Sequence, residues 1–209
     1  MIKFLSYINT NQLLKKTLGY IIDTNNANHN PYHNFDHNLH VANLTYKLTK
    51  HVSVTDNEKK NLIIAGLFHD YNHSGGVHKD DALNIKYAII GFNEFYNHNE
   101  TLFNNGDKKE IITLIYSTKY PIDNDKLIIT PSIKIIRDAD MLYTFTAPFF
   151  QSIILGLAKE FNITISDRII QQIKFINNLK FNTDFGTFIW NTSKDDLLMQ
   201  LSIYNKILN

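Results

Sequence analysis

Apolar residues recur at spacings of three and four along most of the chain, which is the period of an amphipathic helix. Leu13, Leu14, Leu18 and Ile21 form one such stripe and predict a first helix. The sequence contains only four prolines and eight glycines, so few positions interrupt the pattern. The chain is therefore predicted to fold as an all-α protein.

Further helices are predicted on both sides of the histidine-rich part of the chain. One begins after Pro31, with Asn34 as its cap and His37 on its apolar face. The next opens at residues 56–58 and is nearly continuously apolar up to His69, which predicts burial on most sides. Additional helical patterns cover residues 80–97, 107–118, 131–143, 147–161, 166–179 and 193–208.

Composition is that of an ordinary globular protein, with 44% apolar and 20% charged residues in a chain of 209. No shift in composition marks a boundary, so residues 1–209 are expected to form one domain. The net charge is +1 and the basic residues are scattered. We therefore expect no surface for duplex nucleic acid, whereas a small anionic ligand remains compatible with the charge.

Cysteine is absent, so any metal must be held by histidine, carboxylate or water. Residues 1–22 are interrupted by polar side chains, unlike a signal peptide. The longest apolar-looking stretch, residues 145–158, is too short to cross a bilayer. A cytoplasmic location without membrane attachment is the expectation, and the sequence does not indicate the oligomeric state.

Histidines are concentrated in one part of the chain, with eight of the nine between His29 and His78. Five of them lie in residues 32–40 and 69–73. His33 and His37 are four residues apart, as are His69 and His73, so on a helix each pair would project from one face. Imidazole binds Zn, Mn and Fe, and such ions activate water for hydrolysis.

Carboxylates accompany these histidines. Asp70 follows His69 directly, and Asp138 and Asp140 interrupt an apolar helical pattern. A buried carboxylate is costly unless it is paired or binds a metal, so an interior position of Asp140 would indicate a ligand. Each of these features alone is usually incidental, but their joint occurrence predicts a metal site, with either Asp138 or Asp140 as the distal ligand.

The order of these motifs resembles the HD superfamily of metal-dependent phosphohydrolases. More narrowly, it is similar to the catalytic domain of class I cyclic nucleotide phosphodiesterases in compact form. That resemblance implies a helical bundle with the metal site between helices. The matching strings are Tyr32-His33-Asn34 followed by His37, then His69-Asp70-x-x-His73-x-Gly75, then Ala139-Asp140.

The resemblance implies a role for each matching residue. His33 would be the general acid that protonates the leaving oxygen, while Tyr32 and Asn34 would shape its surroundings. Asp70 would also bridge toward a second ion, with His73 close to that ion. The implied metal ligands are His37, His69, Asp70 and Asp140.

A weaker similarity lies near the C-terminus, where the family places a purine-reading glutamine before a Gly-Phe-Ile segment. In this chain the nearest string is residues 184–189, which puts Asp184 in place of the glutamine. An ionised aspartate accepts hydrogen bonds but donates none, which leaves the base preference open. Phe188 is expected to line the substrate pocket.

Taken together, these features predict a metal-dependent phosphodiesterase that acts on a cyclic nucleotide or a related cyclic signalling nucleotide. The cofactors would be one or two divalent ions of Zn, Mn, Fe or Mg. An HD-type nucleotidase or nucleoside triphosphate phosphohydrolase is the alternative, because the chain is short and Ser74 and His78 depart from the phosphodiesterase pattern. A non-catalytic, metal-stabilised binding domain is a further alternative, against which the additional His33 and His73 argue.

Overall fold

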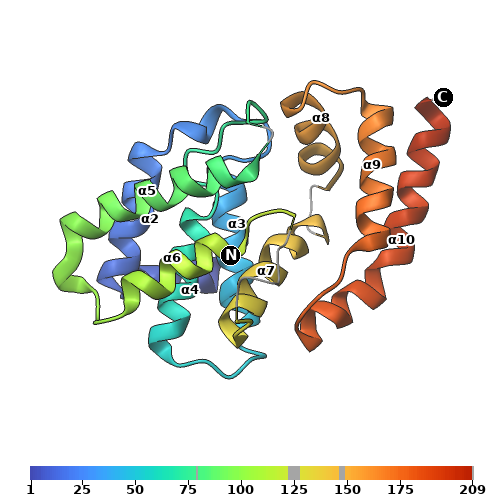
Figure 1. Cartoon of the computed structure of the whole chain (residues 1–209). Helices are drawn as coiled ribbons and strands as arrows, with labels where there is room; N and C mark the ends of the chain where they lie inside the picture. The colour runs from blue at the N-terminus through green and yellow to red at the C-terminus, as the bar shows by residue number, and fades with distance from the viewer. Residues whose placement is uncertain (79, 122–127, 146–148, 209) are drawn as a thin grey trace.

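The structure is a computed structural model that describes residues 1–78, 80–121, 128–145 and 149–208 (Figure 1). This part of the chain is helical and contains no strand, which confirms the all-α prediction. The elements are α1 (Ile2–Thr10), α2 (Gln12–Thr24), η1 (Asn26–His29), α3 (Phe35–Leu48), α4 (Asp56–Phe68), α5 (Asp81–Asn99), η2 (Glu100–Leu102), α6 (Asp107–Ser117), α7 (Pro131–Leu142), η3 (Tyr143–Phe145), η4 (Phe150–Gly156), α8 (Leu157–Glu160), α9 (Ile165–Asn178) and α10 (Asp184–Leu208).

Helix α4 is the centre of the packing. It contacts α2, α3, α5, α6 and α7, and every residue from Asn61 to Phe68 is buried. Its start is fixed by a capping box, in which Thr55 accepts from the Glu58 amide and Glu58 accepts from the Thr55 amide. The predicted burial of this helix on most sides is confirmed. As a result, His69 and Asp70 emerge from the middle of the protein.

Helices α3 and α7 flank α4 and carry the other polar residues of interest. The side chain of Asn34 caps α3 by accepting from the His37 amide at 3.2 Å, as the sequence predicts. Thr130 caps α7 in the same way, and Pro131 occupies its first turn. The two helices also contact each other. Side chains from α3, α7 and the end of α4 can therefore meet.

Close approach of α5 to the core depends on one glycine. A Cβ atom added at Gly91 would lie 2.2 Å from the ring of Tyr71. The Tyr71 hydroxyl continues from there to α2 and donates to the Thr24 hydroxyl at 2.9 Å. Gly91 therefore allows Tyr71 to pack between α2 and α5.

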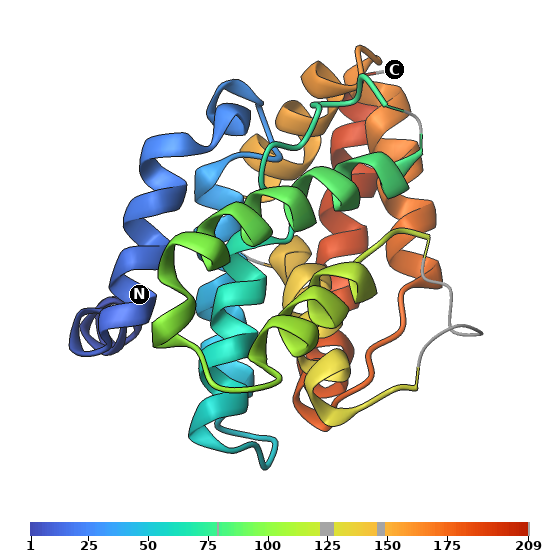
Figure 2. The same cartoon turned by 60° about the vertical axis from the view of Figure 1, so that its left-hand side comes forward.

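The last helices gather on one side of the molecule, with α8, α9 and α10 to the right of α7 in Figure 1. The same grouping is visible in Figure 2, where α9 and α10 run side by side. Helix α9 also contacts η4 and α8. This C-terminal group faces the ends of α3, α4 and α7 and supplies a second wall for the space between them.

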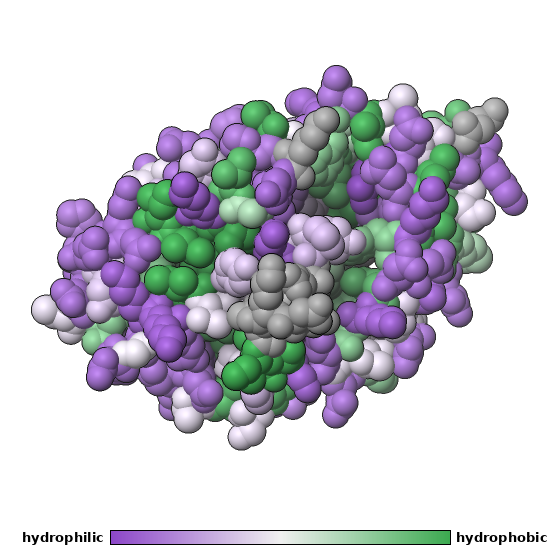
Figure 3. All heavy atoms as spheres, in the orientation of Figure 1, coloured by the Kyte–Doolittle hydropathy of each residue, from purple (hydrophilic) through white to green (hydrophobic). Residues whose placement is uncertain are grey.

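The face seen in Figure 3 is mostly hydrophilic along its rim and carries several separate hydrophobic patches.

Within the described residues, no single helix is both long enough and apolar enough to cross a membrane. A pair of segments bent by 95°, Pro131–Phe145 and Phe150–Glu160, meets those criteria of length and composition only when the two are taken together.

Several predicted boundaries differ from the structure. The first helical stripe is α2, and the separate α1 was not predicted. The prediction for residues 147–161 lies partly outside the described residues, and its described part is the π-helix η4 followed by α8. Helix α10 begins at Asp184 instead of residue 193, although its first turns are rich in residues of low helix propensity. A distant carboxylate, described below, holds the segment that precedes α10.

Candidate metal centre

Four side chains from α3, α7 and the turn that ends α4 converge at one point. The Nε2 atom of His37 lies 3.1 Å from Oδ2 of Asp70 and 3.5 Å from Oδ1 of Asp140. The Nε2 atom of His69 lies 3.2 Å from Oδ2 of Asp70 and 3.7 Å from Oδ1 of Asp140. One ligand atom each from His37, His69 and Asp140 lies within 4.8 Å of the other two, so the three could hold one metal ion. The predicted ligands are thus brought together.

The His69 imidazole is oriented as a metal ligand is. Nδ1 of His69 lies 2.9 Å from the Gly66 carbonyl oxygen, so it carries the proton and donates it there. This bond turns Nε2 toward the cluster, where it donates to the carboxylates when His69 is charged and can bind a cation when His69 is neutral, which is the usual arrangement behind a metal-binding histidine. The Nε2 atoms of His69 and His37 are 3.2 Å apart. Nitrogen lone pairs at this distance, together with carboxylate oxygens, form a donor set that fits a divalent cation.

The carboxylates of the cluster are held in the charged form. Burial acts to raise the pKa of Asp140, but hydrogen bonds from His37 and His69 outweigh it and lower the pKa to about 2. Burial is likewise outweighed at Asp70, where the charge of His69 and the bonds to both imidazoles hold the pKa well below its usual range. Two ionised carboxylates beside two imidazoles suit a cation.

Asp138 has a different function from Asp140. It is fully buried, and its Oδ1 accepts from the backbone and side-chain amides of Asn182 at 2.9 and 2.8 Å. Its Oδ2 accepts from the Thr183 amide and hydroxyl at 2.8 and 2.7 Å. Asp138 therefore anchors the segment before α10, and of the two candidate distal ligands only Asp140 joins the cluster. An interior position was expected for Asp140 from the sequence. Asp138 is the fully buried residue of the two, whereas the Asp140 side chain is 18% exposed.

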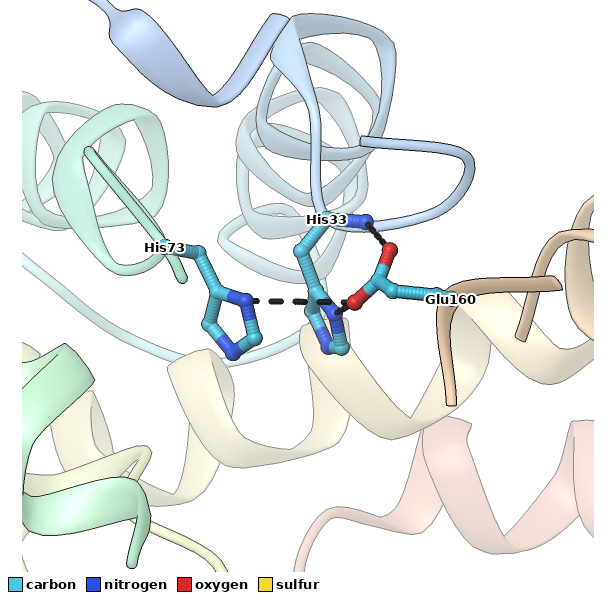
Figure 4. Close-up of side chains that lie close together, drawn as sticks. All are labelled: His33, His73 and Glu160. Carbon is cyan, nitrogen blue, oxygen red and sulfur yellow. Dashed lines mark hydrogen bonds and ion pairs between the residues drawn. The ribbon is translucent and has the colours of Figure 1, made fainter. Parts of the chain in front are cut away.

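A second cluster lies beside the first and consists of His33, His73 and Glu160 (Figure 4). Oε1 of Glu160 contacts Nδ1 of His33 and lies 3.9 Å from Nδ1 of His73. Oε2 of Glu160 accepts from the backbone amides of Tyr32 and His33 at 2.9 and 3.1 Å. The Glu160 side chain is only 1% exposed. A buried carboxylate thus fixes both the backbone and the ring of His33.

The pKa values of the two imidazoles of this cluster are shifted in opposite directions. Burial acts to lower the pKa of His33, but the hydrogen bond to the Glu160 carboxylate and the charge of Asp70 outweigh it and raise the pKa above 6.5. At His73, burial and the neighbouring charge of His33 lower the pKa to about 4. The rings stack with centroids 3.7 Å apart. His33 is therefore the more basic ring of the pair, and His73 is neutral at neutral pH.

One geometric premise of the sequence analysis is wrong. His33 precedes the cap of α3 and His73 lies beyond the end of α4, so neither pair of histidines projects from one helical face. The side chain of Asn34 caps α3, so the helix begins at Phe35 and His33 lies outside it. The two outer histidines come together from loops instead, and each lies next to the inner cluster.

Both clusters open into one cavity of about 350 Å³. Of the predicted site residues, those that line it are Tyr32, His33, His37, Asp70, His73 and Asp140. The ring of Tyr32 lies 4.6 Å from that of His33 and 4.8 Å from that of His37, measured between centroids. Its pKa is raised well above 10 by burial and by the charge of Asp140, so it stays a neutral phenol. A cavity of this size suits a small ligand.

The remaining predicted substrate residues do not line this cavity. Phe188 is 59% exposed on α10, and neither it nor Asp184 lines the cavity. The reason is the direction of α10, which buries Gly186 against Asp138 and turns its neighbours outward. Asn34 also does not line the cavity, because its side chain caps α3 and donates to the Asn30 carbonyl at 2.9 Å.

Sequence reasoning missed two residues of the site. Glu160 ends α8 and belongs to the second cluster, whereas Arg168 lies in the first part of α9 and lines the cavity. Each belongs to a stretch that reads as an ordinary amphipathic helix with charged positions. No motif distinguishes them, since their importance depends on the packing of the C-terminal helices against α3 and α4.

Comparison with known proteins agrees with this geometry. The family model described as HD domain matches residues 34–144, which contain His37, His69, Asp70 and Asp140. Searches of the curated proteins and of the solved structures found no match. The match covers more than half of the chain and includes all four converging side chains. The chain therefore belongs to the HD domain family of metal-dependent phosphohydrolases.

Proposed function

We propose that this HD domain hydrolyses a phosphodiester bond in a small nucleotide, with cyclic nucleotides and related cyclic signalling nucleotides as the leading substrate class. The observation that carries the proposal is the contact of His33 Nδ1 with the buried Glu160 carboxylate, which raises the pKa of a histidine in the same cavity as the metal-ligand cluster. Hydrolysis of a phosphodiester requires a proton for the departing alkoxide. A site that only stored a metal would have no use for such a donor.

His37, His69, Asp70 and Asp140 would hold the metal. A divalent ion bound there supplies Lewis acidity toward phosphate oxygens and lowers the pKa of water. The chain contributes the ionised state of Asp70 and Asp140 and the fixed tautomer of His69, so the ligand set requires little rearrangement.

His33 would act as the general acid. Its Nδ1 is engaged by Glu160, which leaves Nε2 as the nitrogen that donates to the leaving oxygen. As water adds to phosphorus and the phosphorus–oxygen bond breaks, the proton moves from Nε2 to the departing oxygen. Glu160 keeps His33 protonated before this step and holds the ring in place through it. His33 then takes a proton from solvent.

His73 would support this donor rather than share its role. Its Nδ1 accepts from the Gly75 amide at 3.1 Å, and its ring stacks on His33. A low pKa keeps His73 neutral, which avoids repulsion with the protonated His33. His33, His73 and Glu160 also lie close enough together to hold a second ion. If these three residues act as a proton donor and its supports, and do not hold a second ion, the metal content of the protein should not depend on Glu160.

Product identification tests the proposal. Purified protein loaded with Mn²⁺, Mg²⁺ or Zn²⁺ is incubated with cyclic mononucleotides, cyclic dinucleotides, nucleoside monophosphates and nucleoside triphosphates. Ring opening to a linear nucleotide, lost in His33→Ala and retained in His98→Ala, is the expected result. His98 is an exposed histidine of α5 outside the cavity and serves as the matched control.

Two other results would contradict the proposal. Release of inorganic phosphate or triphosphate without ring opening would make the protein a nucleotidase or triphosphate hydrolase instead. Bound metal without turnover of any substrate would favour a binding domain.

A further inference from the structure

Arg168 of α9 is a buried cation in the wall of the cavity. It is 9% exposed and lines the cavity together with residues of both clusters. Gln172 and Phe175 follow it at spacings of four and three residues and line the same cavity, so one face of α9 is turned toward it. None of these three residues belongs to the matched segment 34–144.

The guanidinium of Arg168 lacks the partner that buried arginines ordinarily have. Nη2 donates to Oε1 of Gln172, and Nη1 lies 3.4 Å from Oε1 of Gln171. Within the described residues, no carboxylate lies within 4.0 Å of it, and its Nε has no hydrogen-bond partner. The Nε2 donor of Gln172 is also unpaired in this part of the chain. A buried charge with neutral neighbours and spare donors is destabilising.

The other buried arginine of the chain shows what a structural role looks like. Arg137 is 3% exposed, and its Nε donates to the Ser117 carbonyl at 2.8 Å, which ties α7 to the end of α6. Arg168 makes no such backbone bond through its Nε. Its burial beside the cavity is therefore not explained by helix packing alone.

We propose that Arg168, oriented by Gln172, binds a phosphate oxygen of the substrate at the α9 wall of the cavity. Arginine stays charged and presents several donors in a fixed plane, which suits phosphate oxygens, and the free Gln172 amide adds another donor. The metal ligands come from α3, α7 and the end of α4, so α9 adds a second point of attachment. This inference rests on the proposed function, because it takes the cavity as the substrate site.

Binding of inorganic phosphate to the full chain tests the inference without turnover. Calorimetric titrations compare the wild type with Arg168→Met and with Lys174→Met, which removes one positive charge from an exposed position of the same helix. Each protein is measured with bound metal and after treatment with a chelator. Loss of one or two charge-assisted hydrogen bonds predicts a phosphate affinity about tenfold or more weaker in Arg168→Met. Lys174→Met should match the wild type.

Thermal melting separates this role from a structural one. Replacing an unpaired buried charge by an apolar side chain of similar volume should leave the melting temperature equal or higher, whereas loss of a structural contact would lower it. If Arg168→Met does not fold, Arg168→Lys keeps the charge but loses the planar donors. It should still weaken phosphate binding several-fold.

The outcomes distinguish this inference from the proposed function. Unchanged phosphate affinity in Arg168→Met would overturn the inference while leaving the phosphodiesterase proposal standing. Two results together support a phosphate site at α9. Arg168→Met binds phosphate more weakly than the wild type, and the wild type still binds phosphate after the metal is removed. That support would hold even if the substrate panel yielded no ring opening, a result that would overturn the proposed function alone.

Discussion

The Nε2 atoms of His37 and His69 face each other at 3.2 Å, with the carboxylates of Asp70 and Asp140 beside them. These residues are separated by up to 103 positions in the chain, and the packing of α3, α4 and α7 brings them together. Two imidazole nitrogens at this distance repel unless a proton or a cation lies between them. The metal site is therefore a consequence of how the three helices pack.

Asp140 and Asp138 should respond differently to the same substitution. Asp140→Asn removes a charged ligand and should abolish stoichiometric metal binding while the fold is retained. Asp138→Asn should keep the metal but lower the free energy of unfolding by about 1–3 kcal/mol, because amide hydrogens would face the donors of Asn182 and Thr183. Metal content by mass spectrometry and denaturant unfolding measure both effects. Equal metal loss in the two variants would contradict the assignment.

Loss of the His33 imidazole should affect turnover and not metal content. Proton donation by a positioned side chain contributes about 10²- to 10⁴-fold to a rate, so His33→Ala should reduce kcat within that range. Steady-state rates on a cyclic nucleotide, whose alkoxide leaving group needs a proton, are compared with rates on a chromogenic bis-phosphodiester, and metal is analysed in the same preparation. Substrates whose leaving group needs no proton should be affected least, and an equal loss on all leaving groups would argue against an acid role.

Glu160 should set the pH range of activity. Its carboxylate raises the pKa of His33 above 6.5, and the charges of Asp70 and Asp140 act in the same direction, while His73 is the neutral neighbour. The protonated, active form is therefore retained to higher pH and lost as pH rises through the raised pKa. Glu160→Gln removes the charge and should move the basic limb of the kcat profile to lower pH.

The control for Glu160→Gln is metal content, which should equal that of the wild type. A basic limb that stays in place would show that another group carries the proton. Loss of metal in this variant would instead indicate a second ion held by His33, His73 and Glu160.

The sequence was most informative where chemistry and periodicity coincide. The apolar period of 3.6 predicted α3, α4 and α7, and a carboxylate in the apolar stretch of α7 predicted a ligand there. It could not predict Glu160 or Arg168, because both read as charged positions of ordinary helices until the C-terminal group packs against α3 and α4. The choice between Asp138 and Asp140 depended on Asn182 and Thr183, which lie more than forty residues away.

Asp184 and Phe188 show the opposite limit of sequence reasoning. A short local string suggested Asp184 and Phe188, but the orientation of α10 turns Phe188 to solvent and leaves both outside the cavity. Local similarity carries no information on helix rotation. The expectation that residues 1–209 form one domain remains a prediction, as do the cytoplasmic location and the nature of the substrate.

Gly91 allows a stability prediction that is independent of the metal. Gly91→Ala would place a methyl group 2.2 Å from the Tyr71 ring, which must then shift within the packed interface of α2, α4 and α5. Overpacking of this kind typically costs about 1–3 kcal/mol. Gly19→Ala is the matched control, because a Cβ atom there meets nothing within 4 Å. Denaturant unfolding should show Gly91→Ala destabilised and Gly19→Ala unchanged or slightly stabilised, and equal stability of the two would contradict the packing described.

The most direct measurement is a crystal structure of protein grown with Mn²⁺ or Zn²⁺, with diffraction recorded at the absorption edge of that metal. We expect an anomalous peak at coordination distance, about 2.0–2.2 Å, from Nε2 of His37, Nε2 of His69 and the carboxylates of Asp70 and Asp140. No peak among these four side chains at saturating metal, or a peak bound only by other residues, would contradict it.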